Sequence, residues 1–300
     1  MIDLPYGVNI NILIDDLRIL SWEAADVLLE YSSLIKDNNY KNKIIKSGGL
    51  EDPVTMADLK VNELIIKRLK EKYKYIDWEI LSEENVKIES HHCNTDADWL
   101  WVLDPLDGTK DFIQSTGNYA MHLALNYKRR PCMGIILIPE KEELWISIGE
   151  RLWGEKRNKT LINCEDFKIK DFQEMTIVTS KNHKNEQLNK LIDKVNFKEV
   201  IVMGSVGCKI ASIIRGESDV YISLSLPNQT SPKDWDFAAP EAVLRAAGGS
   251  ITNLENKDLI YNRKSFNQPG MIIASNNKQN HKEICRHLRE IIRKYDIFEI

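Results

Sequence analysis

The sequence predicts a layered α/β protein, with an α+β front half that holds an antiparallel sheet and an α/β back half. Three observations carry this prediction. Apolar residues recur at helical spacing from Ile10 to Ile35, and short β-like runs follow from Ile76 onward. Beyond about residue 165, strand-like and helix-like segments alternate. We therefore expect an N-terminal subdomain over residues 1–165 and a C-terminal subdomain over residues 166–300.

The front half begins with the helix over residues 10–35, which has a single apolar stripe. A polar, lysine-rich stretch follows, Lys36–Pro53, and we expect it to be a mobile loop. Thr55 and Asp58 have capping-box spacing and open a second amphipathic helix. The β-like runs after it are typical of an antiparallel meander, because Lys128–Pro131 supplies a turn between two of them. These runs cover Ile76–Leu81, Trp99–Leu103, Tyr119–Tyr127, Cys132–Ile138 and Glu143–Ile148.

The back half has the pattern of a sheet that is covered by helices and layered against the front half. The predicted strands are Thr176–Thr179, Glu199–Met203, Val220–Ser223, Ser250–Thr252 and Met271–Ala274. The predicted helices are Asn185–Val195, Ser205–Arg215, Asp236–Ala247 and a last helix that starts near Lys278.

The composition is that of an ordinary globular protein, with 43% hydrophobic and 29% charged residues. The net charge of −4 and the isoelectric point near 6.0 argue against a nucleic-acid polymer or a membrane surface as partner. Five scattered cysteines without a C-x-x-C pair indicate reduced thiols. The first residues are acidic where a signal peptide is basic, and no apolar run approaches a membrane span. We therefore expect a soluble cytoplasmic protein that acts on small molecules.

The most informative segment is Trp99–Phe112, in which a continuous apolar run delivers Asp104 to its end. Because Pro105 has no N–H, we expect the strand to stop there and Asp104 and Asp107 to share one tight turn. The two carboxylates, with the Leu106 carbonyl between them, are the kind of oxygen ligands that Mg²⁺ prefers.

Directly after these aspartates, Gly108 and Thr109 can offer backbone N–H groups to a phosphate, where we expect a helix to begin. A solvated turn would also contain aspartate and glycine, so this turn alone does not establish a metal site. Two further acidic motifs strengthen the case: Glu83 and Glu84 end another β-like run, and Asp236 precedes an apolar helix. Asp236 could also be a simple N-cap. Together the three motifs favour a site for divalent cations.

With these motifs in this order, the sequence resembles the lithium-sensitive, magnesium-dependent phosphomonoesterase superfamily that includes inositol monophosphatases and 3′(2′),5′-bisphosphate nucleotidases. The Asp-Pro-Leu-Asp-Gly-Thr element is the most specific of the motifs. The resemblance implies lithium sensitivity and the layered α-β-α-β-α sandwich of the sugar-phosphatase type. It rests on Pro53-Val-Thr-x-Ala-Asp58, Leu81-Ser-Glu-Glu84, Asp104-Pro-Leu-Asp-Gly-Thr109, Gly204-Ser205, and Trp235-Asp236 followed by Ala247-Gly-Gly249.

The resemblance also implies two Mg²⁺ sites. Glu83, Asp104 and the Leu106 carbonyl would hold one ion. Asp104 would share in the second ion with Asp107 and Asp236. A phosphate monoester is dianionic, so two cations are needed to neutralise its oxygens and to lower the pKa of a bound water.

Three residues have implied roles around the metals. Asp58 and Thr109 look like the pair that positions and deprotonates the attacking water. Glu84 looks like a residue that supports the ligands or binds a third, weaker ion.

The details of the motifs point to the substrate. Lys110 follows the Asp-Gly-Thr element, where the inositol enzymes typically have a second threonine, and Ser82 replaces the glycine before the glutamates. Both are nucleotidase-like forms, so the resemblance implies hydrolysis of adenosine 3′,5′-bisphosphate to AMP and phosphate. The residues expected to contact the substrate are Gly108, Thr109, Gly204, Ser205, Lys209 and Asp236.

Lys209 also has an argument of its own. Ser205 is expected to cap a helix whose first turn would contain the lysine, and a cation there opposes the helix dipole. An anionic second phosphate of the substrate would relieve that conflict. The alternative is a surface lysine without function. His122 alternates within a predicted strand and is expected to be structural.

Three alternatives remain open from the sequence. A haloacid-dehalogenase-type phosphatase has an aspartyl nucleophile in Asp-x-Asp-Gly-Thr, whereas here an extra residue separates the two aspartates. An inositol monophosphatase or a fructose-1,6-bisphosphatase would share the fold, and so would a non-catalytic binding protein. The oligomeric state is open between monomer and homodimer.

Overall fold

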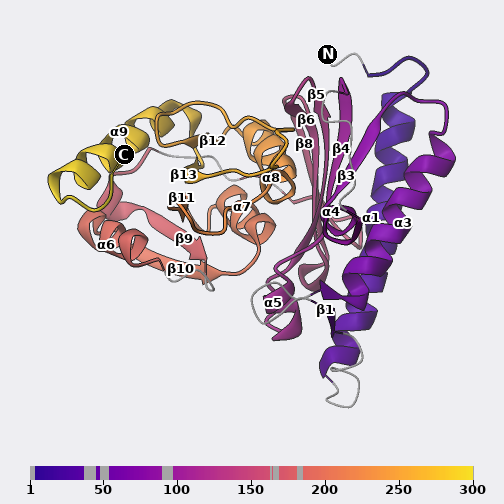
Figure 1. Ribbon diagram of the computed structural model, residues 1–300, viewed down its shortest axis with the longest axis horizontal. Coiled ribbons are helices and arrows are strands. Elements are labelled where there is room, and N and C mark those ends of the chain that lie inside the picture. Colours follow the sequence, from indigo (N-terminus) through magenta and orange to yellow (C-terminus); the bar gives the residue numbers. More distant parts are fainter. Residues whose placement is uncertain are drawn as a thin grey trace.

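The computed structural model describes residues 4–36, 45–47, 54–89, 97–162, 164, 169–180 and 185–299. Its elements stack in five layers, in the order helix, sheet, helix, sheet, helix (Figure 1). A six-stranded sheet comes from the front half of the chain and a five-stranded sheet from the back half. One pair of helices lies between the two sheets. The predicted α-β-α-β-α sandwich is therefore confirmed.

The strands of the six-stranded sheet are β3 (Glu79–Ser82), β4 (Trp99–Asp107), β5 (Ala120–Tyr127), β6 (Arg130–Ile138), β7 (Glu143–Ile148) and β8 (Arg151–Lys156). They follow one another in the sheet in chain order. β3 is parallel to β4, and every later neighbour is antiparallel. Most of these strands are buried on both faces, because helices cover both sides of the sheet.

Two long helices, α1 (Ile10–Lys36) and α3 (Met56–Lys72), cover the outer face of this sheet (Figure 1). Their apolar stripes supply Leu17 and Ile65 to a buried cluster with Leu103 of β4 and other strand residues. The predicted capping box is confirmed at the start of α3, where Thr55 and Asp58 bond each other's backbone. Two short helices, α4 (Glu83–Glu89) and α5 (Thr109–Ile113), follow β3 and β4.

The five-stranded sheet is made of β9 (Thr176–Ser180), β10 (Glu199–Met203), β11 (Val220–Ser225), β12 (Ser250–Asn253) and β13 (Gly270–Ser275). Its order is β10-β9-β11-β13-β12, with the first three strands parallel and the last two antiparallel to their neighbours. Two helices, α6 (Glu186–Val195) and α9 (Lys278–Lys294), cover its outer face. Short 3₁₀ turns lie at Pro139–Lys141 and Phe172–Glu174.

The middle layer is formed by α7 (Val206–Ile214) and α8 (Asp234–Ala246). One buried cluster joins both helices to both sheets. The closest approach is at Gly134 of β6, where an added Cβ would lie 2.6 Å from the Ala239 carbonyl oxygen and 2.8 Å from Ala242 Cβ. Gly134 therefore lets α8 lie against the sheet.

Three elements in the region of the six-stranded sheet differ from those expected from the sequence. The strand expected over Ile76–Leu81 starts only at Glu79 and is parallel to β4, so the region is not wholly an antiparallel meander. β8 is not predicted, because Gly154 interrupts its apolar pattern; that glycine makes room for the ring of Trp145. α4 is also not predicted, because it follows β3 without an intervening turn.

Most of the expected loop, Lys36–Pro53, lies outside the described residues, and so does Pro53 of the first motif. Within this stretch, Ile45–Ser47 form β1, which pairs antiparallel with β2 (Val54–Thr55). The expectation of a loop is therefore wrong for β1.

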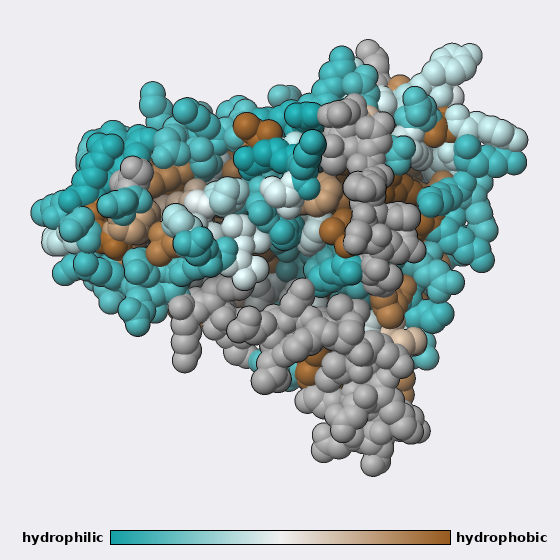
Figure 2. Space-filling model, in the orientation of Figure 1, coloured by the Kyte–Doolittle hydropathy of each residue, from teal (hydrophilic) through white to brown (hydrophobic). Residues whose placement is uncertain are grey.

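The described part of the face seen in Figure 2 is mainly hydrophilic, with apolar side chains in limited patches. Among the described residues, no helix combines the length and the apolar character that crossing a membrane requires. The four described cysteines are free thiols, as expected: Cys132, Cys164, Cys208 and Cys285.

Replacing Gly134 by alanine is expected to destabilise the fold by about 1–3 kcal/mol, because the new methyl group must displace α8 from β6. Urea unfolding measures this change. Gly248→Ala is the control: the added Cβ has open space there, and only the positive φ of 93° opposes it. Of the two substitutions, only Gly134→Ala is expected to displace α8. Equal stability of Gly134→Ala and the parent protein would contradict the tight seating of α8.

Candidate active site

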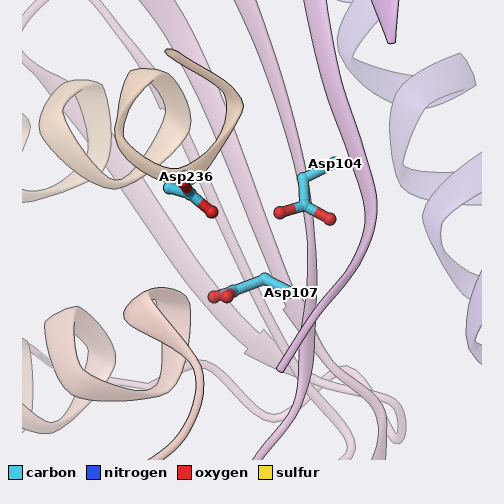
Figure 3. Close-up of side chains that lie close together, drawn as sticks. All are labelled: Asp104, Asp107 and Asp236. Atoms are coloured by element: carbon cyan, nitrogen blue, oxygen red, sulfur yellow. The ribbon is translucent and has the colours of Figure 1, made fainter. Parts of the chain in front are cut away.

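Three carboxylates converge where the six-stranded sheet meets the middle helices. Asp104 and Asp107 come from β4 and Asp236 from the first turn of α8, and each offers an oxygen within 4.8 Å of the others. Figure 3 shows the three side chains gathered between these two elements. Asp104 and Asp107 are only 1% and 8% exposed. Buried like charges at this separation repel one another, so the cluster requires compensating positive charge or protons.

A bulge in β4 gives Asp104 and Asp107 a common direction. Asp104 pairs with His122 and Asp107 with Ala120, so β4 has one residue more than β5 over this stretch. Residues three apart in a regular strand point to opposite faces, and the extra residue returns Asp107 to the face of Asp104. The expectation that Pro105 ends the strand is wrong. Because proline has no N–H, Pro105 interrupts the hydrogen bonds between β4 and β5 only locally, and β4 continues to Asp107. The bulge stands where the tight turn was expected.

One oxygen of Asp107 is held by three neighbours. Its Oδ2 accepts hydrogen bonds from the Ser205 hydroxyl at 2.6 Å and the Gly207 N–H at 3.1 Å, and it lies 3.2 Å from His122 Nε2. His122 Nδ1 lies 3.3 Å from the Trp235 carbonyl oxygen. Both atoms that face the ring nitrogens are oxygens that can accept hydrogen bonds. Because these contacts gather at Oδ2, Oδ1 is the oxygen of Asp107 that can face a cation.

Asp236 occupies the third position of α8 and is not its N-cap. The helix begins at Asp234, two residues earlier than expected. Asp236 Oδ2 accepts a hydrogen bond from the backbone N–H of Lys233 at 2.5 Å, which is the acidic half of a capping box. The bond fixes the side chain at the positive end of the helix dipole, where a carboxylate is favoured.

Glu83 and Glu84 are the first residues of α4, directly after β3. Glu83 lies beside Asp104, since its charge and a hydrogen bond both act to raise the pKa of that aspartate. Its carboxylate is also 2.8 Å from Lys87 Nζ. Glu84 is buried, and its carboxylate is 3.7 Å from the same ammonium. The structure thus brings Glu83 to the three aspartates and leaves Glu84 behind it, beside Lys87.

Burial and mutual repulsion shift the pKa values of these groups. Burial raises the pKa of Asp104 well above its usual value, and the charges of Glu83, Asp107 and Asp236 raise it further. Burial, with Asp107 and Glu83, raises the pKa of Asp236 to about 7. For Asp107, burial acts in the same direction, but His122, Lys209 and the Ser205 hydroxyl outweigh it and lower the pKa. The cluster therefore holds protons until something else supplies positive charge.

Asp58 and Thr109 form a second part of the site. Asp58, at the start of α3, accepts hydrogen bonds through Oδ2 from the backbone N–H and the hydroxyl of Thr55. Its Oδ1 lies 3.4 Å from the Thr109 hydroxyl, which also lies 3.1 Å from the Leu106 carbonyl oxygen. Burial raises the pKa of Asp58 to about 7. This value suits a group that accepts a proton near neutral pH.

The expected helix start at Gly108 and Thr109 is confirmed, and α5 begins there. Gly108 has a φ of 89°, and an added Cβ would lie 3.0 Å from the Asn118 carbonyl oxygen and 3.2 Å from Ser205 Cβ. Glycine is therefore required at this position. The first N–H groups of a helix have no partner inside it, so those of this turn can reach an anion.

The expected cap of α7 is confirmed, because the Ser205 hydroxyl accepts a hydrogen bond from the Cys208 N–H. Lys209 is not a surface lysine: it is only 1% exposed. Its ammonium donates to the Gly204 carbonyl oxygen at 2.7 Å and lies 5.0 Å from the centre of the Tyr221 ring. Burial lowers the pKa of Lys209 to about 8. The lysine thus places a positive charge near Asp107, whose pKa it helps to lower.

The donor set suits hard divalent cations. It consists of carboxylate oxygens, and the carbonyl of Leu106 lies on the same bulge between two of them. The raised pKa values show that Asp104 and Asp236 are unfavourable as anions in this setting, and a bound cation would reverse that. The residues present therefore fit Mg²⁺ or a similar ion.

Two residues of the site are not identified by the sequence analysis. His122 was expected to be structural, and it contacts both Asp107 and the α8 backbone. Asp111 is fully buried against Gly204, where an added Cβ would lie 1.9 Å from Asp111 Oδ2. Both contacts join segments far apart in the chain, so no local spacing signals them. A buried polar residue in a predicted strand is the only hint that the sequence offers for His122.

Comparison with known proteins shows the family to which the chain is similar. The model of the inositol monophosphatase family matches residues 15–293. Two curated relatives share 25% identity with the chain. One is 3′(2′),5′-bisphosphate nucleotidase CysQ of Escherichia coli strain K12, aligned over 87% of this chain and 99% of that protein. The other is 3′(2′),5′-bisphosphate nucleotidase 1 of Dictyostelium discoideum, over 91% and 98%.

Solved structures share the fold. The IMPase of Thermotoga maritima superposes with a TM-score of 0.71 at 20% identity, and the match covers 95% of this chain and 99% of that one.

Divalent cations are expected to stabilise the protein more at about pH 8 than at about pH 6. The folded-state pKa values of Asp58 and Asp236 are raised from 3.8 to about 7. Because the folded chain keeps these two protons more tightly than the unfolded chain does, protonation stabilises the metal-free fold. This stabilisation is fully present below the unfolded-state pKa of 3.8 and is lost as the pH rises through the folded-state pKa of about 7. Mg²⁺ binds the ionised carboxylates, so at the higher pH it restores the stability that the fold loses when these groups release their protons. Thermal melts with and without Mg²⁺ at both pH values measure this. An equal gain at both would count against it.

Proposed function

The chain belongs to the inositol monophosphatase family and is a metal-dependent phosphatase, and on this premise we propose that it hydrolyses adenosine 3′,5′-bisphosphate to AMP and phosphate. The observation that carries the proposal is the convergence of Asp104, Asp107 and Asp236 beside the Asp58–Thr109 pair. Hydrolysis of a phosphate monoester needs a site for cations, which the three aspartates can form, and a site for the attacking water, which the Asp58–Thr109 pair can form.

The carboxylates are assigned to two Mg²⁺ ions. Glu83 and Asp104 would hold one ion with the Leu106 carbonyl. Asp107 and Asp236 would hold the second and share Asp104 with the first. When bound, the ions supply positive charge to the phosphate oxygens and acidity to a water. Glu84 lies behind Glu83 and would support it or bind a third ion.

The reaction then depends on how the chain places the water. The Thr109 hydroxyl can accept a hydrogen bond from the water and donate one to Asp58 Oδ1, 3.4 Å away. The water oxygen forms a bond to phosphorus, and its proton passes by way of Thr109 to Asp58. The bond from phosphorus to the 3′-oxygen of the nucleotide breaks, and that oxygen takes a proton from solvent. With its pKa at about 7, Asp58 can accept and release a proton in each cycle.

The substrate would be held mainly by the two helix starts. The N–H groups of Gly108 and Thr109 would bind the reacting phosphate, and the turn of Gly204 and Ser205 lies next to them. Lys209 would bind the second phosphate. An ammonium has three donor hydrogens, and the Gly204 carbonyl uses one of them. Asp236 would contact a hydroxyl of the sugar.

The names of the curated relatives support this substrate, since they are bisphosphate nucleotidases aligned along most of the chain. An inositol monophosphatase is the second candidate, because solved structures of that description have the same fold. Family membership removes the haloacid-dehalogenase alternative.

A substrate panel decides between the candidates. Phosphate release would be measured with Mg²⁺ from adenosine 3′,5′-bisphosphate, inositol 1-phosphate and fructose 1,6-bisphosphate. We expect kcat/KM for the adenosine compound to exceed the others by about tenfold or more. A preference for inositol phosphate would overturn the substrate and leave the phosphatase assignment in place.

Asp107→Asn is expected to lower kcat by about 100-fold or more, with little change in the fold. The amide oxygen must face the three groups now at Oδ2, so the NH₂ group turns to the cation. Phosphate release at saturating Mg²⁺ measures turnover, and a metal-free thermal melt controls for folding. Near-normal turnover at modest Mg²⁺ would sink the two-metal assignment.

Lys209→Met keeps the aliphatic stem and removes the charge. If the ammonium binds the second phosphate, kcat/KM for adenosine 3′,5′-bisphosphate should fall by about ten- to a hundred-fold. Activity on a monophosphate such as 3′-AMP should change much less. An equal loss on both substrates would mean that Lys209 serves only to hold the Gly204 carbonyl, with which it is already bonded.

A further inference from the structure

A segment far from the motifs holds the start of α8. Residues 260–268, which we call the α8 clamp, lead from the end of the loop after β12 towards β13. The clamp lies against residues 232–234, where the chain enters the helix. The Asp234 N–H donates to the Phe266 carbonyl oxygen at 2.8 Å, and the Gln268 N–H donates to the Pro232 carbonyl oxygen at 2.8 Å. Lys233 and Asn267 form an isolated antiparallel bridge between these bonds.

Asp234 is the centre of the clamp and is fully buried. Its Oδ2 accepts a hydrogen bond from the Asn262 N–H at 2.6 Å, and its Oδ1 accepts one from Gln268 Nε2 at 2.7 Å. The Asn262 side chain in turn accepts a hydrogen bond from Asn126 of β5 at 3.0 Å. A side chain at a helix start usually serves its own helix, whereas this one binds the clamp and links α8 to the sheet.

The clamp is held in an unfavourable backbone conformation. Asn262 and Phe266 have φ values of 59° and 54°. Asparagine tolerates the left-handed region, but for a bulky residue such as phenylalanine this conformation is strained. Such strain persists where the surroundings impose it. Here the Phe266 carbonyl must point to the Asp234 N–H, and the ring packs 6.0 Å from that of Trp235.

The residues that the α8 clamp holds are immediate neighbours of the cluster of three aspartates. Asp236 lies two residues after Asp234 in the same helical turn. On the other side, the Trp235 carbonyl oxygen is 3.3 Å from His122, whose second nitrogen is 3.2 Å from Asp107. The first turn of α8 is thus fixed from two directions, by the clamp and by His122.

We propose that Asp234 is a positioning residue that, through the α8 clamp, sets the place of Asp236 in the divalent-cation site. Asp234 does not reach the cations itself. It holds the helix start against the repulsion between Asp236 and the two aspartates of β4. The proposal rests on the assignment of Asp236 as a ligand in the proposed function.

The test is Asp234→Asn. Both groups that face the carboxylate are donors, so the asparagine must turn its NH₂ group towards one of them. The matched control is Asp219→Asn at the start of β11. Asp219 is also buried, at 3% exposure, and also accepts the backbone N–H of Thr176 and the side-chain amide of Asn276. It pairs in addition with the Lys170 ammonium at 2.8 Å, so its replacement should cost at least as much stability. It lies at the opposite end of β11 from the loop that leads to α8.

The measurement is Mn²⁺ binding to the full chain without substrate, by calorimetry or electron paramagnetic resonance, together with a thermal melt. Loss of a group that orients a metal ligand typically weakens binding by about 10–100-fold. We expect a weakening in this range for Asp234→Asn. Asp219→Asn should bind Mn²⁺ like the parent protein despite a loss of stability at least as large. An affinity for Asp234→Asn within about twofold of the parent would overturn the proposal.

Asp236→Asn separates this proposal from the proposed function. If that variant binds Mn²⁺ as tightly as the parent, Asp236 is no ligand, and the metal assignment fails together with the positioning role. Should Asp234→Asn not fold, Gln268→Met takes its place, since it leaves Asp234 intact and removes the amide that donates to Asp234 Oδ1 and, within the clamp, to the Ile260 carbonyl oxygen. Weaker Mn²⁺ binding by that variant supports the clamp, and unchanged binding overturns it.

Discussion

The mutual repulsion of buried carboxylates is the constraint around which the structure is built. Asp104, Asp107 and Asp236 lie within 4.8 Å of one another, and burial would normally exclude such a group of anions. Three devices hold them in place: the bulge of β4, the seating of α8 on Gly134, and the contacts of His122 and Lys209 near Asp107. The fold accepts unfavourable charge at one point because the apolar clusters formed by the described residues stabilise the rest.

The layered arrangement explains why the site lies where it does. β4 and α8 belong to adjacent layers, so their ligands meet only at the contact between sheet and middle helices. A shift of α8 along the sheet would separate Asp236 from the other two aspartates. The side chains that fix α8 therefore decide whether the three carboxylates meet.

The sequence predicts the residues of the site better than it predicts the contacts that hold them in place. Motif spacing identifies the three aspartates that the structure brings together, and apolar periodicity identifies most helices and strands, because both are properties of contiguous residues. The bulge at Pro105 is read as a turn, since the residues opposite it belong to another strand. β8 is not predicted because Gly154 interrupts its apolar pattern, and α4 is not predicted because it follows β3 without an intervening turn. The burial of Lys209 and the contacts of Asp234 depend on segments that approach only in the folded chain.

The middle layer has a consequence for how the protein is made. The six-stranded sheet is complete in the chain before α7 and α8 are synthesised, and its inner face carries Leu100, Val102 and Ile136. During translation this apolar face has no helices to cover it, so the growing chain exposes a surface that chaperones recognise and that favours aggregation. Asp236, the third aspartate of the cluster, arrives with the covering helix. The set of three carboxylates is therefore complete only after α8 has packed against the sheet.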